Sequence, residues 1–124
     1  MEKIVQEVQQ VVSRYHQAIA DKDLKTALSC LGRTYVGGLT TPEALRKALA
    51  KGLMSTKSGY ANTIEFLHTG VGKNAAVVVT RETGSATWLK GQTGSWKGIT
   101  NLWCLAKVRG RWKIVHSLHK IGKW

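Results

Sequence analysis

The spacing of apolar residues changes once along the chain, and this change most constrains the fold. In the first part, apolar residues recur three and four positions apart, as in a helix with one buried face. From about residue 63 they alternate with polar residues, which is the period of a strand. The residues that define the first helix are Ile4, Val5, Val8, Val11, Val12, Tyr15 and Ile19. Helices followed by strands favour an α+β fold.

Local signals place the ends of three predicted helices. The first helix is expected to end near residue 20. Asp23 can cap a second helix, and Gly32 is expected to end it. Pro42 fits the first position of a third helix, and Gly52 is expected to close that one.

The second part of the chain predicts a meander of antiparallel strands. The predicted strands cover residues 63–68, 75–81, 86–89, 99–107 and 112–119. The glycine-rich GQTGSWKG at 91–98 is expected to be a loop, and VRGR at 108–111 a tight turn. Because no composition shift or linker interrupts the pattern, we expect one domain over residues 1–124.

Composition and the distribution of charged and apolar residues indicate the cellular compartment in which the protein is expected. Glu2 and Glu7 interrupt the apolar N-terminus, so we expect no signal peptide. No apolar run is long enough to span a bilayer, so no membrane association is predicted. Cys30 and Cys104 lack metal-ligand spacing and are expected to be small buried thiols rather than a disulfide. Together these features favour a cytoplasmic protein.

The formal net charge is +12, and it is unevenly placed. Glu82 is the last acidic residue, and eight Lys or Arg follow it. Such a distribution is typical of a surface that binds nucleic acid or an acidic partner. It is also typical of a solvated face, since the cations fall mostly in loops and on alternate strand positions, and we favour this second interpretation.

Two stretches resemble a known superfamily. VVSRYHQAIADKDLKTALSCL and NLWCLAKVRGRWKIVHSLHK resemble the first two helices and the last hairpin of nuclear-transport-factor-2-like proteins. That superfamily includes ketosteroid isomerase, polyketide cyclases and the association domain of calcium/calmodulin-dependent kinase II. The resemblance implies a cone-shaped, cystatin-like α+β roll, with three N-terminal helices packed on a curved antiparallel sheet. Because this fold hosts unrelated activities, it implies little about function.

Strand alternation predicts which residues of the last strand face the helices. Trp112, Ile114, His116 and Leu118 share one face, and His119 lies on the other. The face with the tryptophan is the more apolar, so we expect it to pack against the helices. His116 would then point into the interior of the cone, and His119 would point to the outer face.

The resemblance to ketosteroid isomerase assigns roles to individual residues. Tyr15 matches the tyrosine of that enzyme's oxyanion hole, and Asn101 falls near its second aspartate. The region that should supply the base aspartate reads RTYVGGLTTP and contains no carboxylate. Steroid isomerisation is therefore not expected, because a carbon-bound proton cannot be removed without a positioned base.

A pocket is predicted between the helices and the sheet. The catalytic candidates are His116, Tyr15 and Asn101, although a histidine or tyrosine on an apolar face more often has a packing role. The expected lining residues are Tyr35, Trp103, Trp112, Ile114 and Leu118. No metal site is predicted, because no HxxxH or carboxylate-rich cluster occurs, and no cofactor is predicted, because no phosphate-binding loop occurs.

Three functions remain open. The favoured function is that of a protein that binds a small ligand in the cone. We also expect a homodimer formed sheet to sheet, because both faces of residues 99–107 are apolar. The second is an enzyme of the isomerase, cyclase or dehydratase type that uses His116. The third is an interaction protein that binds nucleic acid or an acidic partner through its basic surface.

Overall fold

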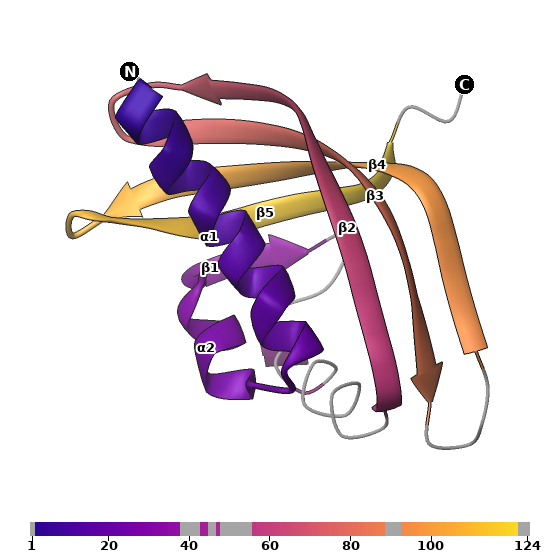
Figure 1. The fold of residues 1–124 in the computed structure, drawn as a ribbon. Coiled ribbons are helices and arrows are strands. Elements are labelled where there is room, and N and C mark those ends of the chain that lie inside the picture. The colour runs from indigo at the N-terminus through magenta and orange to yellow at the C-terminus, as the bar shows by residue number, and fades with distance from the viewer. Residues whose placement is uncertain (1, 38–42, 45–46, 48–55, 89–92, 122–124) are drawn as a thin grey trace.

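The computed structural model describes the backbone of residues 2–37, 43–44, 47, 56–88 and 93–121. It also describes their side chains, except those of residues 33–37, 56–60, 88, 93, 120 and 121. The chain is α+β (Figure 1). Its elements are α1 (Glu2–Ala20), α2 (Leu24–Ser29), β1 (Leu31–Gly37), β2 (Thr56–Val71), β3 (Ala75–Trp88), β4 (Thr93–Val108) and β5 (Arg111–Ile121). Glu43, Ala44 and Lys47 are helical, and the rest of the third predicted helix lies outside the described residues.

The predicted N-terminal helices are confirmed where the structure describes them. α1 ends at Ala20, as its apolar period indicates. Asp23 caps α2, since its carboxylate accepts a hydrogen bond of 3.1 Å from the backbone N–H of Thr26. Neither α1 nor α2 is long and apolar enough to cross a membrane.

The five strands form one sheet in the order β1-β5-β4-β3-β2. β1 pairs with β5 in parallel, whereas the other neighbours are antiparallel. The expectation of a wholly antiparallel sheet is therefore wrong, and Gly32 lies within β1 instead of ending α2. α2 ends before Gly32 because the chain joins the sheet at Leu31, which is buried beside Ile114. The N–H of Ile114 also donates to the carbonyl of Cys30 at 2.8 Å.

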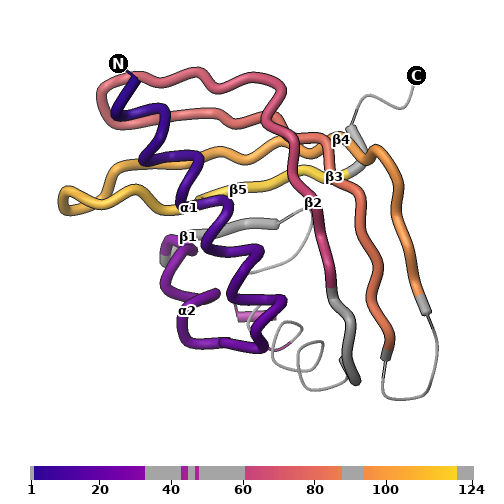
Figure 2. The backbone as a smooth tube through the Cα atoms, viewed as in Figure 1, coloured from indigo at the N-terminus to yellow at the C-terminus, as the bar shows by residue number. Residues whose placement is uncertain are grey.

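The helices lie on one face of the sheet, which we call the inner face (Figure 1). The long strands β2, β3 and β4 bend along their length, and α1 runs across them (Figure 2). The core lies between the two layers, where its most deeply buried side chains are Val8, Val12, Ala27, Val78, Trp103, Leu105 and Ile114. Both cysteines are free thiols; Cys30 is buried and Cys104 is half-buried.

The strands are longer than the sequence predicts. β3 joins two predicted segments, and β4 includes residues 93–98, which we expected to be a loop. Gly98 has a φ of 60° and adds one residue to β4 opposite β3, so the ladder continues through a bulge. The predicted turn at 108–111 is confirmed, with Arg109 and Gly110 both at positive φ as a two-residue hairpin requires.

A bulge in β5 exchanges the two faces of that strand. Leu105 of β4 pairs with Ile114, yet the preceding residue, Cys104, pairs with His116. Val115 is therefore an extra residue, and strict alternation fails there. His116 lies beside Cys104 on the outer face, so the expectation that it points into the interior is wrong. A second irregularity follows Leu118, and the ring of His119 lies on the inner face.

Candidate functional site

A pocket of about 250 Å³ opens on the inner face of the sheet. It is formed by the second half of α1, the middle of β2, β3 and β4, and the end of β5. The lining residues are Tyr15, His16, Ile19, Asn62, Glu82, Trp96, Ile99, Asn101, Trp103 and His119. Five of the ten side chains are aromatic rings, counting both histidines, so the walls are flat and rigid.

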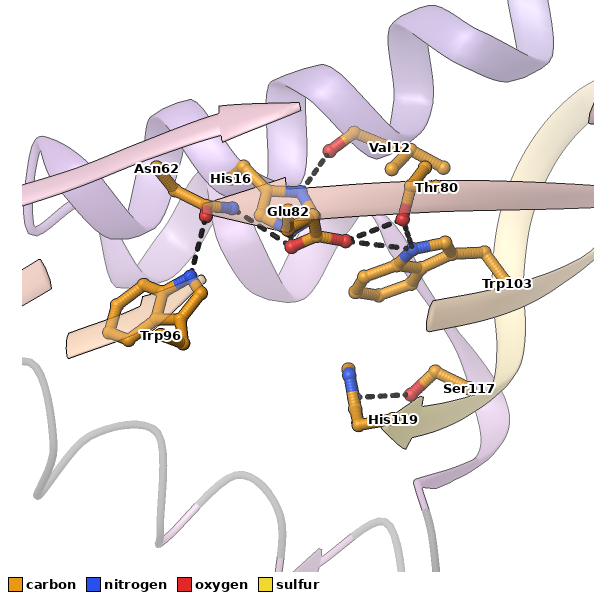
Figure 3. Close-up of polar contacts among 9 residues, drawn as sticks. All are labelled: Val12, His16, Asn62, Thr80, Glu82, Trp96, Trp103, Ser117 and His119. Carbon is orange, nitrogen blue, oxygen red and sulfur yellow. Dashed lines mark hydrogen bonds and ion pairs between the residues drawn. The ribbon is translucent and has the colours of Figure 1, made fainter. Parts of the chain in front are cut away.

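A buried carboxylate stands at the centre of this pocket's polar groups (Figure 3). One oxygen of Glu82 accepts from His16 Nε2 at 2.8 Å and from Asn62 Nδ2 at 2.9 Å. The other accepts from the Thr80 hydroxyl at 2.6 Å and from Trp103 Nε1 at 3.3 Å. Glu82 is only 4% exposed, so these donors replace water around its charge.

His16 completes a buried ion pair. Its Nδ1 lies 2.8 Å from the carbonyl oxygen of Val12, one turn earlier in α1, and its Nε2 faces Glu82. Both ring nitrogens thus face oxygen acceptors, and protons on both satisfy both contacts. A ring with a proton on each nitrogen balances the charge of the Glu82 carboxylate within the pair.

The electrostatics of the pair make Glu82 a poor base. Burial alone would raise the pKa of this carboxyl, but the hydrogen bond and charge of His16, with hydrogen bonds from Thr80 and Asn101, hold it far below its usual range. A carboxylate with so low a pKa and so many donors does not readily take a proton. Glu82 therefore organises the pocket and is not suited to proton abstraction.

Two tryptophans form opposite walls. Trp96 Nε1 donates to Asn62 Oδ1 at 2.8 Å, so the indole is tied to the network around Glu82. Trp103 Nε1 also donates to the Thr80 hydroxyl at 3.0 Å. Gly84 makes room for the first wall, because a Cβ there would lie 2.7 Å from Trp96 and 2.2 Å from the carbonyl oxygen of Ala61.

His119 is the polar side chain set apart from the network (Figure 3). Its Nε2 lies 3.2 Å from the Ser117 hydroxyl, and its ring meets that of Trp103 edge to face at 5.3 Å. Burial lowers the pKa of His119, as does the charge of His16, although Glu82 acts in the opposite direction. At neutral pH the ring is therefore uncharged and can accept or donate a hydrogen bond.

The structure brings together three of the predicted site residues, namely Tyr15, Asn101 and Trp103. Trp112 and Ile114 are core residues that do not line this pocket, and Leu118, 38% exposed, lies on the outer face with His116. Tyr35 lies on β1, and its side chain is outside those described. The lining residues that were not predicted as site residues are His16, Ile19, Asn62, Glu82, Trp96, Ile99 and His119.

Two of these unpredicted residues carry a signal in the sequence. His16 lies four residues after Val12 and next to Tyr15, which places it within the apolar stripe of the first helix. Glu82 follows Ala76, Val78 and Thr80 at alternate positions, so it continues the buried face of its strand. A histidine and a glutamate on two inward faces predict a buried pair.

Within the residues that the structure describes, no group of three His, Cys, Asp or Glu side chains is arranged to bind a metal ion. The donors around Glu82 are protonated nitrogens and a hydroxyl, which compete with a cation for its oxygens.

Comparisons with solved structures identify the fold. A candidate aromatic ring hydroxylase from Novosphingobium aromaticivorans superposes with a TM-score of 0.86 at 15% identity, over 97% of this chain and 90% of that one. A nuclear transport factor 2-like superfamily protein from Salmonella enterica serovar Typhimurium gives 0.78 at 17% identity, over 99% and 98%. A ketosteroid isomerase-like protein from Erwinia carotovora atroseptica gives 0.77 at 14% identity, over 98% and 99%.

The chain thus has the fold of the nuclear-transport-factor-2-like superfamily. No protein-family model and no curated protein matches it by sequence. At these low identities, the likeness shows the fold and does not choose among the superfamily's activities.

Proposed function

We propose that this protein binds a small, uncharged, largely aromatic molecule in the pocket beside Glu82. The observation that carries the proposal is the combination of flat aromatic walls with a charge-balanced polar centre. Trp96 and Trp103 offer ring faces and edges, and His119 offers a hydrogen-bonding group without charge at neutral pH. A charged ligand would lack a compensating partner, because His16 and Glu82 already neutralise each other.

The size of the pocket limits the ligand. At about 250 Å³ it lies below the range of about 300–1,000 Å³ that suits drug-sized molecules. A ligand of one or two rings with one or two polar atoms fits this volume. The walls are held by hydrogen bonds from Trp96 to Asn62 and from Trp103 to Thr80, so little ordering is needed on binding.

The test uses two histidines of one strand that face opposite sides. The protein is titrated with phenol and with indole, and binding is followed by the indole N–H resonances in ¹H–¹⁵N spectra. We expect His119→Trp to fill the pocket and abolish saturable shifts, while His116→Trp leaves the dissociation constant within about twofold. Equal effects of the two variants, or no saturable binding of any probe by the wild type, would refute the proposal.

A second candidate function is proton transfer by His119. An uncharged imidazole in an aromatic pocket is a suitable general base, and Tyr15 and Asn101 line the same pocket as hydrogen-bond donors to a carbonyl oxygen. One solved structure with this fold is described as a ketosteroid isomerase-like protein, and another as a dehydratase candidate of the NTF2-like family. In this reaction His119 removes a proton from the carbon beside a carbonyl and returns one from solvent.

Deuterium exchange separates binding from catalysis. The protein is incubated with cyclohexanone in D₂O, and loss of the α-proton signal is followed by NMR. The enzyme hypothesis is supported if the wild type catalyses this exchange and His119→Gln loses the activity while it keeps its affinity for the probe. Exchange at the rate of buffer alone leaves the protein a binding protein and refutes the second candidate.

We further propose a homodimer formed through the outer face of the sheet. Val77, Val79, Leu102, Cys104 and Leu118 lie side by side there by strand register, and Val77 and Leu118 are 39% and 38% exposed. The association domain of C. elegans CaMKII has the same fold, at a TM-score of 0.69. Light scattering should show that the wild type is a dimer and that Val77→Glu dissociates it. Lys73→Glu, in an exposed turn, should leave the dimer intact. A monomeric wild type at micromolar concentration would refute the proposed dimer.

A further inference from the structure

A buried hydroxyl lies beside the histidine of the pocket at Glu82. Ser117 of β5 is fully buried, and its Oγ lies 3.2 Å from Nε2 of His119, two residues later in the same strand (Figure 3). Ser117 pairs with the buried Trp103 in the sheet, yet it does not line the pocket itself. Ser117 can therefore influence a ligand in the pocket only through His119.

The two ring nitrogens of His119 have different surroundings. Nε2 meets the Ser117 hydroxyl, whereas Nδ1 has no hydrogen-bond partner within the part of the chain that the structure describes. His119 lines the pocket and is exposed, so a molecule there can reach its ring. Because Nε2 is occupied, Nδ1 is the nitrogen that remains for a ligand.

The contact with Ser117 decides what Nδ1 can do. In a neutral imidazole one nitrogen carries the proton and the other accepts a hydrogen bond. If Nε2–H donates to Ser117, Nδ1 is an acceptor. If the Ser117 hydroxyl donates to Nε2 instead, Nδ1 carries the proton and is a donor. The two arrangements select opposite kinds of ligand.

Two arguments favour Nε2–H as the donor to Ser117. Free histidine in water prefers the tautomer with the proton on Nε2, so this arrangement needs no shift of the intrinsic equilibrium. A hydroxyl that accepts from Nε2–H also keeps the same role when Nδ1 takes up a proton, because both nitrogens of the charged ring are donors. A hydroxyl that donates to Nε2 would instead have to turn away.

We propose that Ser117 is a positioning residue that holds His119 with its proton on Nε2, so that Nδ1 selects ligands that present an O–H or N–H donor. This inference rests on the ligand pocket proposed above and adds the class of ligand, namely phenol-like or indole-like compounds rather than their methylated counterparts. For the second candidate function, it assigns Nδ1 as the atom that takes up the proton from carbon.

The first measurement needs no ligand. Long-range ¹H–¹⁵N spectra of the imidazole rings at about pH 8, where a histidine of lowered pKa is neutral, show which nitrogen carries the proton. The signals of His119 are assigned by their loss in His119→Gln. We expect the proton on Nε2 in the wild type, and a proton on Nδ1 there would overturn the proposal.

Variants of Ser117 test whether the hydroxyl sets this tautomer. In Ser117→Ala an Nε2–H would lose its buried acceptor, so we expect the proton to move to Nδ1. Ser117→Cys keeps the buried volume with only a weak acceptor and should shift the tautomer in the same direction, which separates this effect from that of a cavity. Ser95→Ala makes the same change at an exposed position of β4 and should have no effect. A tautomer that does not respond to either variant of Ser117 would overturn the proposal.

The second measurement compares ligands with and without a donor. Phenol is matched with anisole, and indole with N-methylindole, and the dissociation constants are measured by NMR titration. A hydrogen bond between neutral groups contributes about three- to tenfold in affinity, so the preference for the donor ligand should fall by about that factor in Ser117→Ala. Comparing this preference between proteins cancels the differences in size and hydration between the ligands. An equal preference in the wild type and Ser117→Ala would overturn the proposal.

The two measurements distinguish this inference from the pocket function on which it rests. If no probe binds the wild type, the pocket function fails, and the tautomer still decides the role of Ser117. If the probes bind but their preference and the tautomer are both independent of Ser117, the pocket function stands and the role of Ser117 is refuted.

Discussion

Replacing Glu82 by glutamine should destabilise the fold by far more than one exposed charge could. The variant keeps the shape of the side chain but leaves His16 without its counter-charge in a buried position. Breaking a buried pair by removing one partner costs about 3–5 kcal/mol, and because the amide retains one acceptor oxygen we expect about 3 kcal/mol. For a chain of this length, that corresponds to a fall in Tm of about 10 °C.

The matched control is Glu65→Gln, which breaks the ion pair with Arg81 on the neighbouring strands. That pair is 3.4 Å apart, and its side chains are 62% and 51% exposed, so its loss should change the free energy of unfolding by less than about 1 kcal/mol. Both variants are unfolded in urea at the same protein concentration, followed by tryptophan fluorescence. Equal midpoints for the two variants would refute the structural role given to Glu82.

The same pair predicts how stability depends on pH. The pKa of Glu82 is lower in the folded protein than in the unfolded chain, where it is about 4.3. On acidification the unfolded state therefore takes up the proton first, and the stabilisation is lost as pH falls below that value. The difference in stability between the wild type and Glu82→Gln should be full above about pH 5 and should shrink toward about pH 2. A difference independent of pH would contradict the charge-based explanation.

Three more predictions concern the walls of the pocket. An NMR titration should give His119 a pKa below 6.5, and Glu82→Gln should lower it further, because Glu82 is the group that raises it; an upward shift would contradict this electrostatic assignment. Gly84→Ala should destabilise the fold by about 2 kcal/mol or more, because its Cβ meets the backbone of Ala61, whereas Gly72→Ala, 3.4 Å from its nearest neighbour, should be tolerated in the same melt. Gly84→Ala should also shift the Trp96 indole resonance; an unchanged signal would mean that the ring does not need this glycine.

Local patterns predicted the elements that depend on local interactions. The apolar stripe indicated α1, Asp23 indicated the cap of α2, and the turn before Arg111 joined two strands as expected. β1 was missed because it pairs in parallel with β5, which is distant in sequence, and no feature of RTYVG indicates this partner. Residues 93–98 were missed because their glycines suggested a loop, whereas Gly98 only adds a bulge to a continuous strand.

The site was predicted in part for the same reason. Tyr15 and Trp103 lie on faces that period alone defines, so their inward orientation could be predicted. Glu82 was not predicted as a site residue, although the alternation of its strand points it inward, because a glutamate is rarely buried without a partner and its partner His16 is distant in sequence. His116 and His119 were exchanged because the extra residue at Val115 depends on pairing with β4 and leaves no local trace.

The bulge at Val115 has an evolutionary consequence. Deleting one codon there would restore regular alternation and leave His116, Ser117 and Leu118 opposite the same β4 partners, so the orientation of these side chains would not change. A lineage could therefore gain or lose this extra residue in one genetic event while the same side chains still face the pocket. Among distant homologues, length variation at this point should therefore occur without a change in ligand preference, whereas substitutions at the inward positions of the strand should accompany such changes.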